Sequence, residues 1–321
     1  MSVLVYCENW DGKFKKLSFE LVAYASQVAK MMDTNVCALS IGNVNSDELN
    51  KLGNYGAQRI ISVQNPNLAQ LDSQTYTAAI AEVAQKVDAK VIVISHNNTG
   101  KSIAPRLSVR LKAALGPGVS RLPLSVSPFT VYKRAFSGAS FMDVTLNTDV
   151  KIITLAQNSF DFAETAGSAT IEEMQVNVEA PRTVVCDVQR QTGKLLLTDA
   201  EIVVSGGRGM KSADNWGPLE ELAGLLGAAT ACSRPVSDEG WRPHDEHTGQ
   251  TGKIIAPNLY IAVGISGATQ HIAGVSSSKY IVAINNDKDA PIFEVAQYGI
   301  VGDAQKVLPQ IISAVKEVKS K

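Results

Sequence analysis

Glycines, hydroxyls, amides and one histidine are concentrated in two turns that lie one strand apart in the second half of the sequence. The first turn is Gly249-Gln250-Thr251-Gly252-Lys253, and the second runs from Gly264 through Ser266-Gly267-Ala268 to Gln270-His271. Glycine allows a backbone to approach a ligand closely. Hydroxyls, amides and the N–H groups at a helix start bind phosphate and carbonyl oxygens. The two turns therefore predict a site for a flat, polar-edged and phosphorylated ligand.

Two arginines follow strand-like segments in the same half of the chain. Arg208 lies in Gly206-Gly207-Arg208-Gly209, and Arg234 lies in Ser233-Arg234-Pro235. A guanidinium at the carboxyl edge of a parallel sheet can bind phosphate through two hydrogen bonds. Each arginine could equally be a solvated surface residue.

Asn285 and Asp303 each follow a strand-like segment or a turn. Taken singly, each is typical of a helix cap or a turn residue. Together with the arginines they would lie at neighbouring strand ends of one sheet, where open α/β sheets bind their ligands. The prediction of a site therefore depends on the whole set of residues.

Other chemistries lack the residues that they need. Gln250-Thr251-Gly252-Lys253 is similar to the end of a P-loop, but the leading glycine is absent and no Ser or Thr follows the lysine. His244 and His247 have no Cys or third His at ligand spacing, so no metal site is expected. No nucleophile elbow and no Ser/His/Asp order occurs, so no catalytic residue is expected. A net charge of −1 gives no general attraction to nucleic acid.

The first part of the sequence alternates strand and helix patterns, which predicts a parallel, doubly wound sheet. The expected strands are 3–6, 36–41, 59–63 and 91–95, and the expected helices are 17–32, 47–52, 75–87 and 101–111. After Gly116-Pro117-Gly118, short β-type segments at 130–136, 140–146 and 150–155, with a hairpin turn at 136–139, predict an antiparallel extension of that sheet. An extended segment over 174–190 then leads to the expected domain boundary.

The second part restarts the α/β pattern. Its expected strands are 201–205, 228–232, 258–263, 280–284 and 293–295, and its expected helices are 218–226, 266–274 and 304–319. We therefore expect two doubly wound Rossmann-like domains, 1–193 and 194–321, the second with a parallel sheet. No apolar segment is long enough to span a bilayer, and no signal or transit segment precedes the first strand. Four cysteines without paired spacing fit a reducing compartment, so a cytoplasmic protein without membrane insertion is expected.

The ordered motifs of the second domain resemble the alpha subunit of electron transfer flavoprotein. They are Ser205-Gly206-Gly207-Arg208-Gly209, Ser233-Arg234-Pro235, and the segments 249–257, 259–271, 284–287, 290–293 and 298–303. The first domain matches more loosely, mainly in its layout and in Val3-Leu4-Val5.

This resemblance implies a bacterial electron carrier without substrate turnover of its own. FAD would be bound non-covalently by the second domain, and the first, adenine-nucleotide-hydrolase-like domain would face a partner and bind no FAD. The partner would be a beta subunit that carries AMP, in a heterodimer. Electrons would come from flavin dehydrogenases, such as the acyl-CoA dehydrogenases of fatty acid β-oxidation. They would pass to an electron transfer flavoprotein–quinone oxidoreductase or the respiratory chain.

The resemblance also assigns roles to individual residues. Arg208 and Ser266 would contact the phosphates, Thr251 would bond near flavin N5 and His271 near the pyrimidine O2, and Arg234 would lie over the ring. Asn285 and Asp303 would hold the adenosine. The full implied FAD-binding set is Arg208, Ser233, Arg234, Gly249, Gln250, Thr251, Gly264, Ser266, Gly267, Ala268, Gln270, His271, Asn285 and Asp303. A reduced, anionic flavin needs nearby positive charge and hydrogen-bond donors, which Arg234 and His271 would supply.

Three alternatives stay open at this stage. An electron-bifurcating member of the same family would have a second FAD in its beta subunit. An NAD-dependent enzyme on a deacetylase-like α/β domain would need a catalytic histidine, for which His271 is the candidate. A purely structural nucleotide-binding module would bind nucleotide through its first domain. The apolar face of 304–318 could cover its own sheet or pack against the beta subunit.

Overall fold

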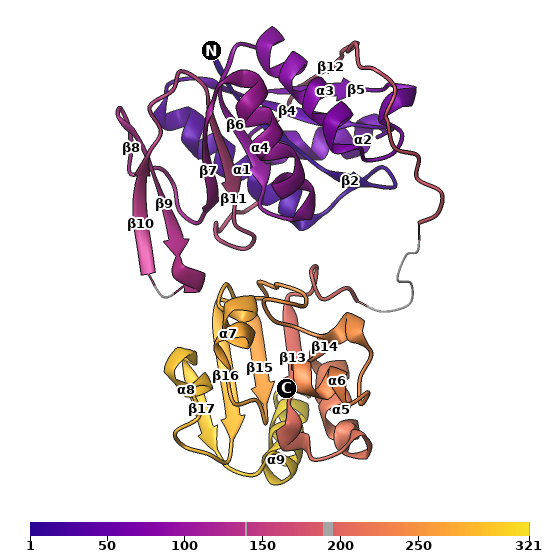
Figure 1. Cartoon of the computed structure of the whole chain (residues 1–321), viewed down its shortest axis with the longest axis vertical. Coiled ribbons are helices and arrows are strands. Elements are labelled where there is room, and N and C mark those ends of the chain that lie inside the picture. The colour runs from indigo at the N-terminus through magenta and orange to yellow at the C-terminus, as the bar shows by residue number, and fades with distance from the viewer. Residues whose placement is uncertain (139, 189–194, 321) are drawn as a thin grey trace. The chain divides into compact units, whose positions relative to one another are not determined.

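The computed structural model describes residues 1–138, 140–188 and 195–320. The chain forms two compact units, Met1–Val188 and Gln189–Lys321, which are coloured indigo to magenta and orange to yellow in Figure 1. The boundary expected between 193 and 194 falls outside the described residues, so that position stays a prediction.

The first unit is built on a mixed sheet whose central strands are parallel and buried on both faces. Its strand order is β10-β9-β7-β11-β6-β1-β4-β5-β12. The parallel strands at its centre are β1 (Ser2–Tyr6), β4 (Asn35–Ile41), β5 (Arg59–Val63), β6 (Ala89–Ser95) and β11 (Lys151–Leu155). Every residue of β1 is buried, because helices cover both faces of the sheet and each face must then be apolar.

The helices of this unit divide between the two faces of the sheet. Side chains of α1 (Lys16–Met31) pack with Val3 and Val5 on one face. Side chains of α3 (Ser73–Lys86) and α4 (Asn98–Leu111) pack with Leu4 and Tyr6 on the other. The remaining short helix, α2, spans Ser46–Asn50. The alternation along β1 follows from the strand period of two.

The expected antiparallel extension is only partly right. β9 (Phe129–Ala135) and β10 (Ser140–Thr145) pair antiparallel, as expected, and Phe136–Gly138 forms the turn between them, with residue 139 outside the described part. β11 is different: it pairs in parallel with β6 and with β7 (Ala114–Val119). The expected direction of β11 was wrong because its partner β7 was not recognised: β7 contains Gly116-Pro117-Gly118, a sequence typical of a turn between elements. A short apolar run does not reveal strand direction.

Several short strands were not expected from the sequence. β12 (Thr170–Glu173) pairs in parallel with β5 at the sheet edge, and the segment 174–188 that follows it is not a strand. The others are β2 (Asn9–Trp10), β3 (Lys13–Phe14) and β8 (Ser125–Val126). Two-residue strands carry too few residues for a periodic pattern.

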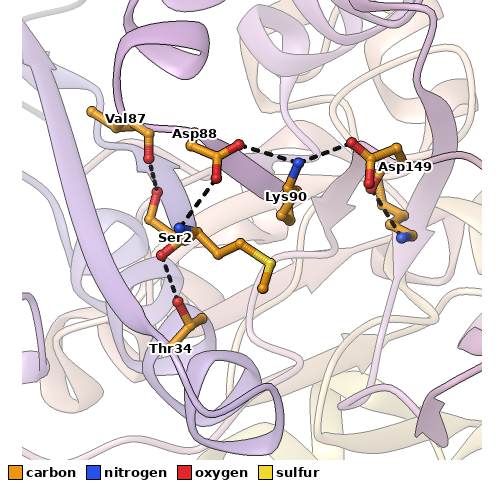
Figure 2. Close-up of polar contacts among 8 residues, drawn as sticks. Ser2, Thr34, Val87, Asp88, Lys90 and Asp149 are labelled. Atoms are coloured by element: carbon orange, nitrogen blue, oxygen red, sulfur yellow. Dashed lines mark hydrogen bonds and ion pairs between the residues drawn. The ribbon is translucent and has the colours of Figure 1, made fainter.

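Polar contacts connect the strand starts at the amino-terminal edge of the first sheet, as Figure 2 shows. The amino terminus lies 3.2 Å from Asp88 Oδ2, and Lys90 Nζ lies 3.1 Å from Asp88 Oδ1 and 2.9 Å from Asp149 Oδ2. Ser2 Oγ donates to the Val87 carbonyl at 2.9 Å. The ion pairs are largely solvent-exposed, and exposed pairs of this kind stabilise a fold by less than about 1 kcal/mol each.

The second unit has one parallel sheet with the strand order β14-β13-β15-β16-β17. Its strands are β13 (Ile202–Gly206), β14 (Ala229–Cys232), β15 (Leu259–Val263), β16 (Tyr280–Asn285) and β17 (Tyr298–Val301). Its helices are α5 (Gly217–Leu226), α6 (Arg234–Asp238), α7 (Thr269–Val275), α8 (Ile292–Val295) and α9 (Ala304–Lys319). After β13 the chain adds β14 on one side of this strand and then β15, β16 and β17 on the other. The reversal therefore falls between β13 and β15, where such sheets have a crevice at the carboxyl ends of the strands.

One element of the second unit was predicted wrongly. The strand expected at 293–295 is the helix α8, and the last strand is β17. Pro291 precedes the helix, and the Ile292 N–H donates to the Ser266 carbonyl at 3.0 Å, which fixes the start of α8 against the loop after β15. Three apolar residues fit a helical turn as well as a strand, so the pattern could not decide.

The apolar face of α9 covers the sheet of its own unit. Leu308 and Ile312 are buried in the cluster that also holds Val204 and Val263, and Val307, Ile311 and Val315 pack against it. Within the described residues, no helix is both long enough and apolar enough to span a membrane.

Candidate functional site

A cavity of about 540 Å³ lies where β13, β14, β15 and β16 end. Its lining begins just after each of these strands, with Arg208 and Gly209, Ser233 and Arg234, Gly264 to Ala268, and Asn285 to Asp287. The turn around Gly249 and the first turn of α7 complete the wall. The cavity is therefore at the strand-order reversal, where the sheet topology predicts a ligand site.

The floor of the cavity depends on direct contact between two backbone turns. The Gly209 N–H donates to the Gly264 carbonyl at 3.0 Å, and the Gly207 N–H donates to the Val263 carbonyl at 2.9 Å. A Cβ added to Gly209 would lie 2.6 Å from the Gly264 Cα, and one added to Gly264 would lie 2.7 Å from the Gly209 Cα. Only glycine fits at either position, and Gly264 also has a left-handed φ of +62°.

The turn at 249–253 is fixed to α7 in the same way. The Gln250 N–H donates to the Gln270 carbonyl at 2.7 Å. A Cβ added to Gly274 would lie 2.4 Å from the Gly249 Cα. The two turns that the sequence analysis singled out are thus in contact, and backbone hydrogen bonds hold their relative position.

A buried histidine lies on the wall between these turns. His271 Nε2 is 2.8 Å from the Tyr260 hydroxyl, and the Thr248 backbone lies close enough to the ring to raise its pKa. Nδ1 is buried and has no partner with good hydrogen-bond geometry among the described residues. Burial lowers the pKa of His271 to about 4, so its imidazole is neutral at neutral pH. A neutral imidazole with an unsatisfied nitrogen can donate or accept one hydrogen bond from a ligand.

Positive charge lies at the rim of the cavity. Arg208 is exposed and, within the part of the chain that the structure describes, forms no ion pair. The Arg234 side chain is 63% exposed, and its Nε lies 3.4 Å from Asp238 Oδ2, four residues further along α6. Both arginines line the cavity, so both could reach an anionic ligand without breaking a buried ion pair.

Asn285 connects the ends of β15 and β16. Its Nδ2 donates to the Ile265 carbonyl at 2.9 Å, and its Oδ1 accepts from the Asp287 N–H at 3.0 Å. The side chain is nearly buried and lines the cavity, so Asn285 both shapes the wall and closes the turn.

The structure brings most of the predicted site residues together. Those that line the cavity are Arg208, Ser233, Arg234, Gly249, Thr251, Gly264, Ser266, Gly267, Ala268, Gln270, His271 and Asn285. Gln250 and Asp303 are not in the lining. Gln250 is exposed, and Asp303 accepts from the Gln305 N–H at 2.9 Å as the N-cap of α9 and pairs with Lys211 at 2.9 Å. The ion pair with Lys211 and the bond from Gln305 hold the pKa of Asp303 below its usual value.

Other lining residues were missed by the sequence analysis. They are Gly209, Pro235, Asp238, His247, Thr248, Ile265, Asn286, Asp287 and Ala290. Most directly adjoin a predicted residue, so a wider motif would have included them. His247 was considered only as a metal ligand. In the described part of the chain, no group of three or more His, Cys, Asp or Glu side chains is placed to hold a metal ion.

Comparison with known proteins decides the family. Residues 3–179 match the family model described as the electron transfer flavoprotein domain, and residues 196–276 match the electron transfer flavoprotein FAD-binding domain. The electron transfer flavoprotein subunit alpha of Bacillus subtilis (strain 168) is 35% identical over 320 residues, with 98% of both chains covered. The chain belongs to the electron transfer flavoprotein alpha-subunit family. The predicted family and the two α/β domains are therefore confirmed.

Two further relatives show the range of this flavoprotein family. The electron transfer flavoprotein subunit alpha of Pseudomonas aeruginosa is 35% identical over 317 residues, covering 98% of this chain and 100% of the relative. The subunit LctC of an NAD(+),ferredoxin lactate dehydrogenase from Acetobacterium woodii is 30% identical over 320 residues, covering 98% of this chain and 77% of the relative. The cavity belongs to the second unit, and every lining strand end before residue 276 lies in the segment matched by the FAD-binding domain.

Proposed function

We propose that the cavity of the second unit binds FAD non-covalently and that the chain carries electrons as one subunit of a heterodimer, without substrate turnover of its own. The observation that carries this proposal is a cavity that lies inside a segment matching an FAD-binding domain and is lined by contacting glycine turns, two exposed arginines and a neutral histidine. Arginines and backbone turns of this kind suit a ligand with phosphates and polar edges. A volume of about 540 Å³ is in the range of cofactor pockets.

The residues that line the cavity divide into two groups that suit the two ends of FAD. The glycine contact at Gly209 and Gly264, with Ser266 and the Arg208 guanidinium, would hold the phosphates. Arg234, Thr251 and His271, on the other wall, would hold the flavin ring. When bound, FAD supplies the redox chemistry. The chain supplies a permanent cation in Arg234 and a neutral hydrogen-bonding group in His271, both of which favour a negatively charged reduced flavin.

The partners follow from the family. We expect a beta subunit that carries AMP, flavin dehydrogenases such as acyl-CoA dehydrogenases as electron donors, and a quinone oxidoreductase as acceptor. The relative named as a subunit of an NAD(+),ferredoxin lactate dehydrogenase supports a second candidate, an electron-bifurcating complex with a second FAD in the beta subunit.

Copurification with the product of the neighbouring gene tests the proposal. The complex should be yellow, and nucleotide extraction should release FAD and AMP in equal amounts. Two FAD and no AMP would establish the bifurcating candidate instead. A colourless complex that binds NAD would overturn the proposal in favour of an NAD-dependent enzyme. As a control, a chain that ends at Val188 should bind no FAD, even with the partner present.

A further inference from the structure

His247 is a buried side chain of the cavity wall that neither the motifs nor the family resemblance assigns. It follows the short helix His244–Glu246, is 2% exposed and lines the cavity. Its backbone lies beside the end of β14, where an isolated parallel bridge pairs it with Cys232. The Lys253 N–H donates to the His247 carbonyl at 2.9 Å, and the next residue, Thr248, donates to the Cys232 carbonyl at 3.0 Å. The backbone of His247 is therefore held on both sides.

The imidazole ring of His247 lies against two glycines of the 249–253 turn. A Cβ added to Gly252 would lie 2.8 Å from its Nδ1, and one added to Gly249 would lie 3.5 Å from its Nε2. The ring thus fills the space that side chains at these positions would need. The turn that carries Thr251 packs directly against the His247 ring, so a shift of the ring would also shift the turn.

One ring nitrogen of His247 is buried without a hydrogen bond to any described residue, which is unusual in a folded protein. Nδ1 is buried and has no hydrogen-bond partner among the residues that the structure describes. Burial lowers the pKa of His247, the neighbouring His244 and Arg234 lower it further, and Asp238 raises it. The imidazole is therefore neutral near pH 7 and carries one N–H and one lone pair. Nδ1 lies beside Gly252, which does not line the cavity, whereas Nε2 lies on the side of Gly249, which does. Nε2 is therefore the nitrogen placed to bond to a ligand in the cavity.

We propose that His247 is a second histidine, beside His271, that contacts the flavin and positions it as a neutral hydrogen-bonding group. This inference rests on the assignment of FAD to the cavity. His247 and His271 both lie close to Gly249: the Cβ that would lie 3.5 Å from His247 Nε2 would lie 3.7 Å from the His271 Cα. The two histidines therefore adjoin the same glycine turn, and both line the cavity.

His244 provides a matched control three residues away. Its ring centroid is 5.4 Å from that of His247, but the side chain is exposed, is not in the lining, and has its Nδ1 3.3 Å from Ser237 Oγ. The variants to compare in the purified two-subunit complex are His247→Leu, His247→Gln and His244→Gln. Glutamine keeps a donor and an acceptor, whereas leucine keeps neither.

The first measurements are the dissociation constant for FAD and the visible absorption spectrum of the bound flavin. We expect His247→Leu to weaken binding roughly tenfold and to shift the flavin absorption bands, because one hydrogen bond is lost. His247→Gln should recover most of the affinity, and His244→Gln should match the parent. Parent affinity and an unchanged spectrum in folded His247→Leu would reduce His247 to a packing residue and overturn the inference.

Imidazole nitrogen NMR keeps the inference testable if His247→Leu does not fold. The chain has four histidines, so ¹⁵N-histidine labelling gives few signals, and His247→Gln identifies the one to follow. Addition of FAD to the flavin-free complex should move the His247 nitrogen resonances and leave those of His244 in place. Unmoved His247 resonances with FAD bound would overturn the inference. Absence of any FAD binding by the parent would instead refute the proposed function.

Discussion

The carboxyl-terminal edges of the two parallel sheets differ in how their polar side chains are satisfied. In the first unit, Glu8 after β1 accepts from Ser95 Oγ at 2.6 Å and from Asn97 Nδ2 at 2.8 Å at the end of β6. His96 Nδ1 lies 2.7 Å from Thr154 Oγ1. In the second unit, Nδ1 of both His247 and His271 lacks a partner among the described residues.

Both edges contain a strand-order reversal, between β6 and β1 in the first sheet and between β13 and β15 in the second. The reversal alone therefore does not make a ligand site. At the first edge Glu8, Ser95 and Asn97 bond to one another, and at the second the exposed Arg208 and Arg234 line a cavity. An unpartnered polar atom alone does not make the difference, because Ser40 Oγ in β4 is also buried without a partner among the described residues. The cavity and its positive charge distinguish the site from the structural edge.

The largest effect is expected where the second edge depends on backbone contact. Gly209→Ala places a Cβ 2.6 Å from the Gly264 Cα and must push the two loops apart. Overpacking of this kind destabilises a fold by about 1–3 kcal/mol, and FAD affinity should fall by more than tenfold. Thermal unfolding and FAD titration measure both. Gly224→Ala in α5, where nothing lies within 4 Å, should bind FAD normally and be at least as stable as the parent.

Acid should weaken both units, because each edge carries a histidine that folding keeps neutral. Burial lowers the pKa of His96 and of His271 to about 4. Between the unfolded value near 6.5 and pH 4, the unfolded chain binds a proton that the folded chain does not, so stability falls as pH falls through this window. Each histidine should remove about 2 kcal/mol by pH 5.

Urea unfolding at pH 7 and pH 5 checks this prediction for the second unit. The measurement uses the flavin-free Trp10→Phe variant, in which the remaining tryptophans are Trp216 and Trp241. Both lie in the second unit, so tryptophan fluorescence reports the unfolding of that unit alone. His271→Asn should flatten the pH dependence of its unfolding free energy, and the exposed His244→Asn should not. An equal slope in His271→Asn and the parent would show that His271 is not kept neutral by folding.

Charge at the rim should have a smaller effect, confined to the second edge. Arg234→Ala removes a cation from the cavity and should lower the midpoint potential of bound FAD. A charge-assisted hydrogen bond contributes about 1.5 kcal/mol, or about 30 mV for a two-electron couple. Arg234→Lys should give an intermediate potential, because a point charge keeps the attraction but loses the planar contact.

Potentiometric titration of the complex measures these potentials. Lys316→Ala is the control: this lysine pairs with Glu221 at 2.7 Å and does not line the cavity. If Arg234→Ala and Lys316→Ala leave the potential equally unchanged, Arg234 is a surface residue and the flavin lies elsewhere.

The smallest effect is expected at the amino-terminal edge of the first sheet. Lys90→Ala removes its ion pairs with Asp88 and Asp149, which are mostly solvent-exposed. Unfolding free energy should drop by less than about 1 kcal/mol, and FAD affinity should not change. A large loss of FAD affinity in Lys90→Ala would mean that the two units are coupled in binding, and the comparison of separate edges would fail.

The sequence predicted the layers of the fold better than the strand partners. Long periodic segments such as α1 and α9 were placed within one residue, because their apolar spacing is set by the buried face of each helix. β7 and β12 were missed, and β11 was given the wrong direction. Strand pairing depends on contacts far apart in the chain, which local pattern does not contain.

For the candidate site, the sequence identified the residues in recognisable turns better than those whose role depends on burial. Residues in recognisable turns, such as Thr251 and Ser266, line the cavity. Asp303 was assigned to the adenosine end by the family resemblance, and that role stays a prediction; in the structure its carboxylate caps α9 and pairs with Lys211. His247 was passed over because its importance arises from burial and from a missing hydrogen bond, and neither can be read from residue types.

The mutual contact of Gly209 and Gly264 limits how this sequence can change over evolutionary time. A side chain at either position would overlap the other backbone, so replacing either glycine first carries a cost in stability. A descendant that lost its ligand would still keep both glycines for as long as it kept the fold. Retention of the two glycines in related sequences therefore indicates that the two loops still pack together. Whether a related protein still binds the cofactor has to be judged from the arginines and histidines around them.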